Sequence, residues 1–186
     1  MLADRRTRGT LNPMEGRFEE VDIRRAKPAD AGDIARVQVD AWRETYAGVL
    51  PAPILADLDV VSRAEKWAQD IESTEIHTWV ATARDLGIVG FASLGPSQDA
   101  DVTRTTQELY AIYLVPDAWG KGIARGLMKT VFEEVPDGAD LTLWVIADNA
   151  RALQFYRRHG FLDDGVERHS NADGAGAVEV RYRRRG

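Results

Sequence analysis

A short glycine-rich segment carries the clearest chemical signal in this chain of 186 residues. It reads Trp119-Gly120-Lys121-Gly122-Ile123-Ala124 and lies between an expected buried strand and an expected amphipathic helix. Glycines let the backbone turn sharply and approach a ligand closely. A helix start also leaves several N–H groups without partners, at the positive end of the helix dipole. The segment therefore predicts an anion site suited to phosphate, with Lys121 and Arg125 adding positive charge at its rim.

The spacing within this loop argues against two common nucleotide-binding motifs. A Walker A loop requires Ser or Thr after its Gly-Lys pair, whereas Gly122 follows Lys121 here. A dinucleotide-binding fingerprint requires a third glycine, which Gly126 supplies one residue late, and it normally follows the first strand of an alternating series. Taken alone, the segment is also compatible with a glycine-rich helix start that binds no ligand.

The sequence around this loop resembles the central motif of a known enzyme family. Residues 108–116 and 119–128 together are similar to that motif in the GNAT acetyltransferases, whose loop reads Gln/Arg-x-x-Gly-x-Gly/Ala. Gly122 and Ala124 match the last two positions of the loop, whereas Trp119 stands where Gln or Arg is usual. The family uses the backbone amides of this loop to bind the CoA pyrophosphate.

Further segments resemble the same family, in the expected order along the chain. Residues 144–161 are similar to its Asn-x-x-Ala-x-x-Phe-Tyr-x-x-x-Gly-Phe block, and residues 179–182 look like its last strand. Residues 42–48 resemble a stretch that recurs in a bacterial subset of the family. The resemblance covers about residues 21–184, and two spaced motifs in order are far more specific than either one.

The resemblance implies that an acetyl group passes from acetyl-CoA directly to a primary amine, without an acyl-enzyme. The absence of cysteine is consistent with this route. In the family, the tyrosine of the Phe-Tyr pair points at the CoA sulfur, so Tyr156 is expected to protonate the leaving thiolate; a core tyrosine is the alternative. Glu108 stands where a general base is frequent in the family, and the alternative is a solvated glutamate at a strand edge.

The expected cofactor contacts also follow from the resemblance. Leu114 and Val115 would offer backbone groups to the pantetheine arm, and Asn149 would hydrogen-bond the same arm, with Ala152 beside it. An N-cap is the alternative role for Asn149, and one side chain could serve both uses. The residues expected around the pyrophosphate are Gly120, Lys121, Gly122, Ile123, Ala124 and Arg125.

The acceptor is the least determined part of the interpretation. Trp42 and Tyr46 are expected to form one wall of its site, with burial in the core as the alternative for Trp42. The acceptor would be a small-molecule or peptide amine, and a non-catalytic acyl-CoA-binding regulatory module is the alternative function. Many members of the family are dimers, and the sequence identifies no interface for a homodimer.

Periodicity and turn residues predict a single α/β domain with a mixed, mostly antiparallel sheet flanked by helices. Asp30 is expected to cap the first helix, and Ser62 and Glu65 are expected to form a capping box. The expected strands are residues 21–26, 78–83, 88–94, 109–115, 141–146, 161–167 and 178–182, with a glycine-rich turn at 171–177. The expected helices are residues 30–46, 51–58, 62–71, 123–135 and 149–160. One parallel crossover is expected between strands 109–115 and 141–146.

Composition narrows the class of protein. With 44% hydrophobic and 29% charged residues, the chain reads as an ordinary water-soluble domain spanning residues 21–186. Residues 1–20 are polar and arginine-rich, which suggests a flexible extension. A net charge of −6 argues against nucleic-acid binding, and three scattered histidines without cysteine argue against a metal site. The lack of a long apolar stretch predicts no membrane span and a cytoplasmic protein.

Overall fold

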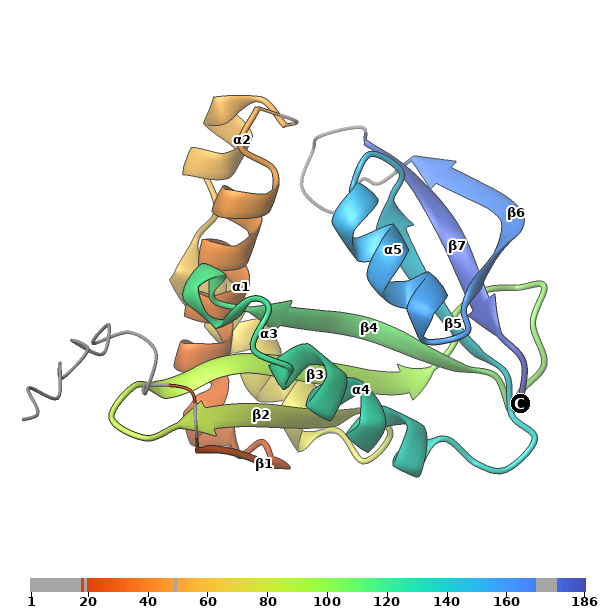
Figure 1. The fold of residues 1–186 in the computed structure, drawn as a ribbon, viewed down its shortest axis with the longest axis horizontal. Helices are drawn as coiled ribbons and strands as arrows, with labels where there is room; N and C mark the ends of the chain where they lie inside the picture. The colour runs from red at the N-terminus through yellow and green to blue at the C-terminus, as the bar shows by residue number, and fades with distance from the viewer. Residues whose placement is uncertain (1–17, 19, 49, 170–176) are drawn as a thin grey trace, which may run out of the picture.

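A computed structural model describes residues 18, 20–48, 50–169 and 177–186, which fold around one seven-stranded sheet (Figure 1). The strand order is β1-β2-β3-β4-β5-β7-β6. Every neighbouring pair is antiparallel except β4 and β5, which run parallel. The strands are β1 Val21–Arg25, β2 His77–Ala83, β3 Gly87–Pro96, β4 Gln107–Leu114, β5 Leu141–Ile146, β6 Leu162–His169 and β7 Val178–Arg184. The predicted mixed, mostly antiparallel sheet is confirmed.

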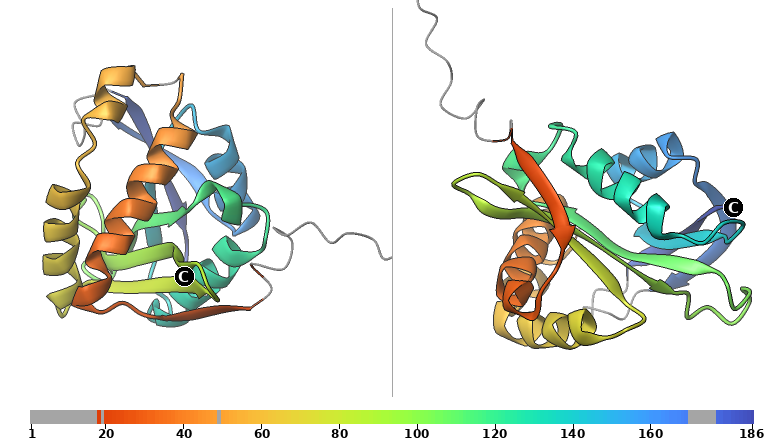
Figure 2. Two further views of the ribbon diagram at one scale, coloured as in Figure 1. Left: turned by 90° about the vertical axis from the view of Figure 1, so that its left-hand side faces the viewer. Right: turned by 90° about the horizontal axis from the view of Figure 1, so that it is seen from below.

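Helices cover both faces of the sheet (Figure 2). One face carries α1 and α3, and the other carries α4 and α5. The helices are α1 Ala31–Thr45, α2 Ala52–Ala56, α3 Val60–Glu72, α4 Ile123–Glu134 and α5 Ala150–Arg158. Their apolar stripes explain this arrangement, because Ile34 and Val37 of α1 and Leu127 and Val131 of α4 are fully buried against the strands.

One predicted helix start is wrong, and one predicted helix cap lacks its side-chain hydrogen bond. The helix expected from Ser62 begins at Val60, because the side chain of Asp59 accepts hydrogen bonds from the N–H groups of Val61 and Ser62 at 3.1 and 2.9 Å. Asp30 precedes α1 but makes no side-chain cap, since its carboxylate binds Arg24 at 2.8 Å instead. The predicted turn at 171–176 and most of residues 1–20 lie outside the described residues.

The strands β4 and β5 form a wedge at the centre of the sheet. Their only paired positions are Gln107 with Leu141 and Glu108 with Thr142, and beyond these positions the two strands diverge (Figure 1). We call the paired region the closed end of the wedge, and the diverging region that faces α4 and α5 its open end. Because a strand without a neighbour leaves its N–H and C=O groups unpaired, the open end exposes part of the β4 backbone.

Candidate active site

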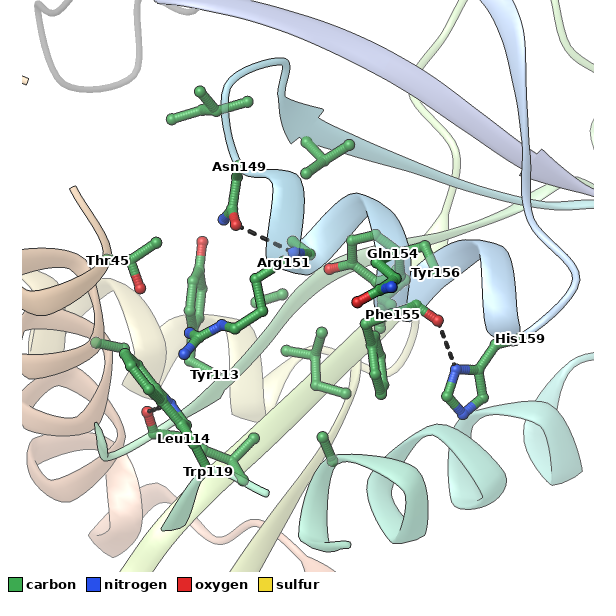
Figure 3. Close-up of a pocket in the computed structure, with 18 of the residues that line it drawn as sticks. Thr45, Tyr113, Leu114, Trp119, Asn149, Arg151, Gln154, Phe155, Tyr156 and His159 are labelled. Carbon is green, nitrogen blue, oxygen red and sulfur yellow. Dashed lines mark hydrogen bonds between the residues drawn. The ribbon is translucent and has the colours of Figure 1, made fainter. Parts of the chain in front are cut away.

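A cavity of about 640 Å³ occupies the open end of the wedge (Figure 3). Its walls come from the end of α1, from β4 and β5, from the loop before α4, and from α5. The predicted site residues that line it are Trp42, Tyr46, Leu114, Gly120, Gly122, Ile123, Ala124, Arg125, Asn149, Ala152 and Tyr156. Three predicted residues, Glu108, Val115 and Lys121, are not part of this lining.

The start of α4 has the features of an anion site. Gly120 and Gly122 have φ values of 74° and 82°, in the left-handed region that glycine adopts most readily. No side chain caps this end of the helix, and its first turn holds no acidic residue. The helical hydrogen bonds begin with the N–H of Gly126, which donates to the carbonyl of Gly122 at 3.1 Å. The amides that precede Gly126 in the first turn therefore have no partner within the helix. Arg125 lies in this turn, where the dipole disfavours a cation unless an anion is bound nearby.

Trp119 lies against the exposed edge of β4. Its indole Nε1 donates a hydrogen bond to the carbonyl of Leu114 at 3.2 Å. The guanidinium of Arg151 stacks over its ring, with the arginine Cζ 3.3 Å from the ring centroid (Figure 3). The residue that departs from the family motif therefore binds a backbone group that was expected to contact the cofactor.

The backbone N–H and carbonyl of Val115 already have hydrogen-bond partners within the protein. Its N–H donates to the carbonyl of Val89 at 2.9 Å, and its own carbonyl accepts from the N–H of Ala118 at 3.0 Å. Both backbone groups therefore have protein partners, because the chain at this point turns away from the wedge toward β3 and the loop. The expectation of a pantetheine contact is thus weakened at Val115.

Asn149 joins two walls of the cavity. Its side-chain oxygen accepts from the N–H of Ala152 at 3.1 Å, which makes it the N-cap of α5. Its amide nitrogen donates to the hydroxyl of Tyr46 at 3.3 Å, across the cavity on the chain segment that follows α1. The N-cap role is therefore present, and the same side chain holds Tyr46 in place.

Tyr156 is almost completely buried, and its ring lies edge-on to Phe155 and Phe161. No described residue hydrogen-bonds its hydroxyl, and burial raises the pKa of this phenol well above its usual range. The ordinary pKa is about 10 for a phenol and about 8.5 for a thiol, so complete proton transfer to a thiolate costs about 2 kcal/mol before burial is counted. Tyr156 is therefore suited to donate a hydrogen bond to a thiolate, and the full transfer expected from the sequence is uphill.

Glu108 lies at the closed end of the wedge, with 8% of its surface exposed. Its carboxylate accepts a hydrogen bond from the Ser97 hydroxyl at 3.1 Å. Burial raises its pKa, which the bond from Ser97 partly offsets. The next two residues of β4, Leu109 and Tyr110, line the cavity, but Glu108 does not.

The structure adds three charged residues to the cavity wall that the sequence analysis missed: Arg151, Arg158 and Glu179. Glu179 of β7 lines the cavity and pairs with Arg168 of β6 at 2.7 Å. Among the described residues it is the one carboxylate in the cavity wall. Arg151 also lines the cavity, and its position in the first turn of α5 was a readable signal, because a helix dipole disfavours a cation there. The place of Glu179 depends on strand order, which local sequence does not reveal.

Two indole nitrogens in the cavity wall have no hydrogen-bond partner among the described residues. They belong to Trp42 and Trp144, and both are fully shielded from solvent. The ring of Trp42 packs edge-on against Tyr46 with the centroids 5.0 Å apart. A buried donor without a partner costs free energy, so these two groups make the cavity wall less stable than a fully hydrogen-bonded one.

A buried arginine lies beside the closed end, opposite Trp144 in the pairing of β5 with β7. Arg181 of β7 is 2% exposed and forms ion pairs with Asp99, Asp101 and Asp164 at 3.0, 2.6 and 2.9 Å. These contacts raise the pKa of Arg181 and lower that of Asp101 to about 2. Two of the three carboxylates lie in the loop between β3 and β4, so Arg181 ties that loop to the last strand.

Comparison with known proteins gives the class to which this fold and site belong. The family described as "Acetyltransferase (GNAT) family" matches residues 39–161, and the chain belongs to that family. The chain is 32% identical to the uncharacterized N-acetyltransferase YuaI of Bacillus subtilis (strain 168), over 79% of its own length and 85% of the relative. It is 26% identical to the probable N-acetyltransferase Rv2775 of Mycobacterium tuberculosis, over 78% and 82%. The protein is thus an acetyltransferase.

Solved structures share this fold. PaiA N-acetyltransferase from Thermoplasma acidophilum, in complex with coenzyme A, aligns with a TM-score of 0.71 at 20% identity, over 90% of this chain and 99% of that one. Ribosomal-protein-alanine N-acetyltransferase from Brucella melitensis aligns with a TM-score of 0.69 at 25% identity, over 89% and 99%. The seven-stranded sheet and its flanking helices match these architectures.

Within the described part of the chain, no helix is both long and apolar enough to cross a membrane. No group of three or more His, Asp or Glu side chains in the same residues is arranged to hold a metal ion.

Proposed function

We propose that this protein transfers the acetyl group of acetyl-CoA directly to the primary amine of a small acceptor. The observation that carries the proposal is the open end of the wedge, where the unpaired edge of β4 lies beside the uncapped start of α4. An extended pantetheine arm has amide groups that can pair with an exposed strand edge. Its phosphates would then reach the free amides of α4, which suit an anion.

The leaving sulfur would lie beside Tyr156. The amine nitrogen attacks the thioester carbonyl, the carbon–sulfur bond breaks, and the products are an amide and a CoA thiolate that becomes a thiol. A buried phenol that keeps its proton can stabilise the thiolate as it forms, because a hydrogen bond to a charged acceptor is strong in a desolvated site. This role agrees with the raised pKa of Tyr156 and with its position in the cavity wall.

A base is needed because an amine with a pKa near 10 is mostly protonated at neutral pH. Two carboxylates can take this proton. Glu108 is buried next to two residues of the cavity wall, so its action would require a water molecule between it and the amine. Glu179 lines the cavity itself, but Arg168 holds it in an ion pair. We favour Glu108, because burial raises its pKa toward that of an effective base.

The acceptor would be a small molecule or the flexible end of a peptide. The pantetheine arm must share the cavity, which leaves room for a slender amine next to Trp42 and Tyr46. The domain that does this chemistry would span residues 21–186, and Phe18 also packs against its core.

The proposal is tested by mixing the protein with acetyl-CoA and a panel of amines, and by following free thiol and the acetylated product. The panel contains polyamines, amino acids, aminoglycosides and short peptides with free N-termini. We expect amine-dependent thiol release above the hydrolysis seen without amine. Binding of CoA without thiol release for any amine would instead support a non-catalytic acyl-CoA-binding module.

A further inference from the structure

Arg151 is a cation in the cavity wall for which the structure shows no carboxylate partner. Among the described residues, no acidic side chain lies within ion-pair distance of its guanidinium. The charge of Glu44 acts on it from farther away, and burial lowers its pKa. Arg151 as a whole is exposed to solvent, so its charge can reach an anion that enters the cavity.

The guanidinium is held in one place by an aromatic platform. It stacks on Trp119 with its Cζ 3.3 Å from the ring centroid, a close cation–π contact. The platform is fixed in turn, because the Trp119 indole donates to the carbonyl of Leu114 at 3.2 Å. Stacking occupies a face of the planar guanidinium and leaves its N–H edges available to an acceptor.

The platform also places this charge next to the anion site at the start of α4. Trp119 directly precedes Gly120, and two residues later Gly122 is the N-cap position of α4, where no side chain caps the helix. Arg151 approaches from α5, on the other side of the cavity (Figure 3). Arg125 and the positive end of α4 therefore face the same space as Arg151.

We propose that Arg151, positioned by Trp119, binds the diphosphate of the acyl donor from the side opposite to the α4 amides. This assignment rests on the proposed function, because it takes CoA as the ligand. The motif position that usually carries Gln or Arg holds Trp119 here, and the cation comes from α5 instead. Arginine suits the role, since its donors match two phosphate oxygens at once.

The test compares Arg151→Gln with Arg36→Gln, which removes the same charge from an exposed ion pair on α1. Calorimetry measures the affinity of each protein for CoA and for dephospho-CoA, which keeps the diphosphate but lacks the 3′-phosphate. We expect Arg151→Gln to weaken both ligands by about 10- to 100-fold. Arg36→Gln should stay within twofold of the wild type for both.

Two further measurements separate a phosphate contact from a structural effect. The affinity of the wild type should fall more between low and high salt than that of Arg151→Gln, because salt screens a charge contact. Trp119→Ala should weaken CoA binding about as much as Arg151→Gln, and the double variant should add little, because the two residues act as one unit.

Three results would overturn the assignment. The first is CoA affinity of Arg151→Gln within twofold of the wild type, and the second is a salt dependence unchanged by the substitution. The third is a loss seen with CoA but not with dephospho-CoA, which would place Arg151 at the 3′-phosphate. Failure of the wild type to bind either ligand would instead overturn the proposed function, and the Arg151 assignment with it.

Discussion

The two ends of the β4–β5 wedge differ in whether their polar groups have hydrogen-bond or ion-pair partners within the protein. Beside the closed end, the buried Arg181 has three carboxylate partners, and at that end Glu108, Ser97 and Thr142 share hydrogen bonds. At the open end, the indole nitrogens of Trp42 and Trp144 have no partner among the described residues, and α4 begins without a cap.

The two ends differ in what their polar groups contribute: stability of the fold at the closed end, and ligand binding at the open end. A buried polar group that is satisfied within the protein holds the fold together, whereas one that is left unsatisfied costs free energy until a ligand supplies the partner. Substitutions at the closed end should therefore change mainly the free energy of unfolding. Substitutions at the open end should change mainly binding or turnover.

The largest effect is expected from Arg181→Gln beside the closed end. It leaves the half-buried carboxylates of Asp99 and Asp164 without their main cation, which we expect to lower the free energy of unfolding by about 3–5 kcal/mol. Chemical denaturation measures the change. Arg84→Gln breaks an exposed pair with Glu20 and should cost less than about 1 kcal/mol. An equal cost for the two variants would refute the contrast between the ends.

Tyr156→Phe tests the open end with little change in packing. The lost hydrogen bond to the leaving sulfur should lower kcat about 100-fold while KM for acetyl-CoA changes less than threefold. Steady-state thiol release measures both. The control is Tyr182→Phe, which removes a buried hydroxyl bonded to Arg157 at 2.6 Å, outside the cavity. It should lose stability and keep its kcat; an unchanged kcat in Tyr156→Phe would remove this tyrosine from the mechanism.

Gly122→Val should weaken CoA binding at least tenfold, because a branched side chain cannot keep the left-handed backbone that aims the α4 amides. The matched control is Gly138→Val, at an exposed turn where φ is 75° and a Cβ would also meet open space. Both variants carry similar strain and should lose about 1–2 kcal/mol of stability. Calorimetry with CoA should separate them, and equal affinities would show that the loop geometry does not matter for binding.

The smallest effect is expected from Glu108→Gln, and it depends on pH. Burial raises the pKa of Glu108 in the folded state, so the folded protein binds this proton more tightly than the unfolded chain. The charge then costs stability as the pH rises through the unfolded and then the folded pKa. We therefore expect the variant to raise Tm at pH 8 more than at pH 5, measured by thermal melting. A greater gain at pH 5 would contradict the direction of the shift.

Glu108→Gln also tests the base. If Glu108 takes the proton from the amine, the variant loses the rise of kcat/KM between pH 6 and 8 that the wild type shows. Full activity with an unchanged pH profile would exclude Glu108 as the base and leave Glu179, the carboxylate in the cavity wall, as the candidate.

Much of the fold was predictable because its signals are local. The stripe of Ile34 and Val37 and the four-residue steps of Leu127 and Val131 placed α1 and α4 correctly. Helix starts were harder, since several polar residues near each start compete for the same N–H groups. Asp59 caps α3 in place of the expected Ser62, for this reason.

The candidate site was predictable only in part. Nine of the cavity residues could be named because two motifs carry them, and Trp42 and Tyr46 were named from the separate stretch at residues 42–48. Lys121 is exposed and lies outside the cavity lining, which its place in the motif did not reveal. Arg151 could have been noticed from its place in the first turn of α5, whereas no local pattern shows that β7 brings Glu179 to the wedge.

The order of elements, the glycine loop and the family resemblance can be read along the chain, because periodicity, turn residues and motif spacing are properties of neighbouring residues. The pairing of polar groups follows from the folded arrangement, which places Arg181 next to Asp99, 82 positions away in the chain, and Arg151 on Trp119. Charged groups that are distant in the sequence become neighbours only when whole strands and helices pack together. That packing decides which polar groups are satisfied within the protein and which are left for a ligand.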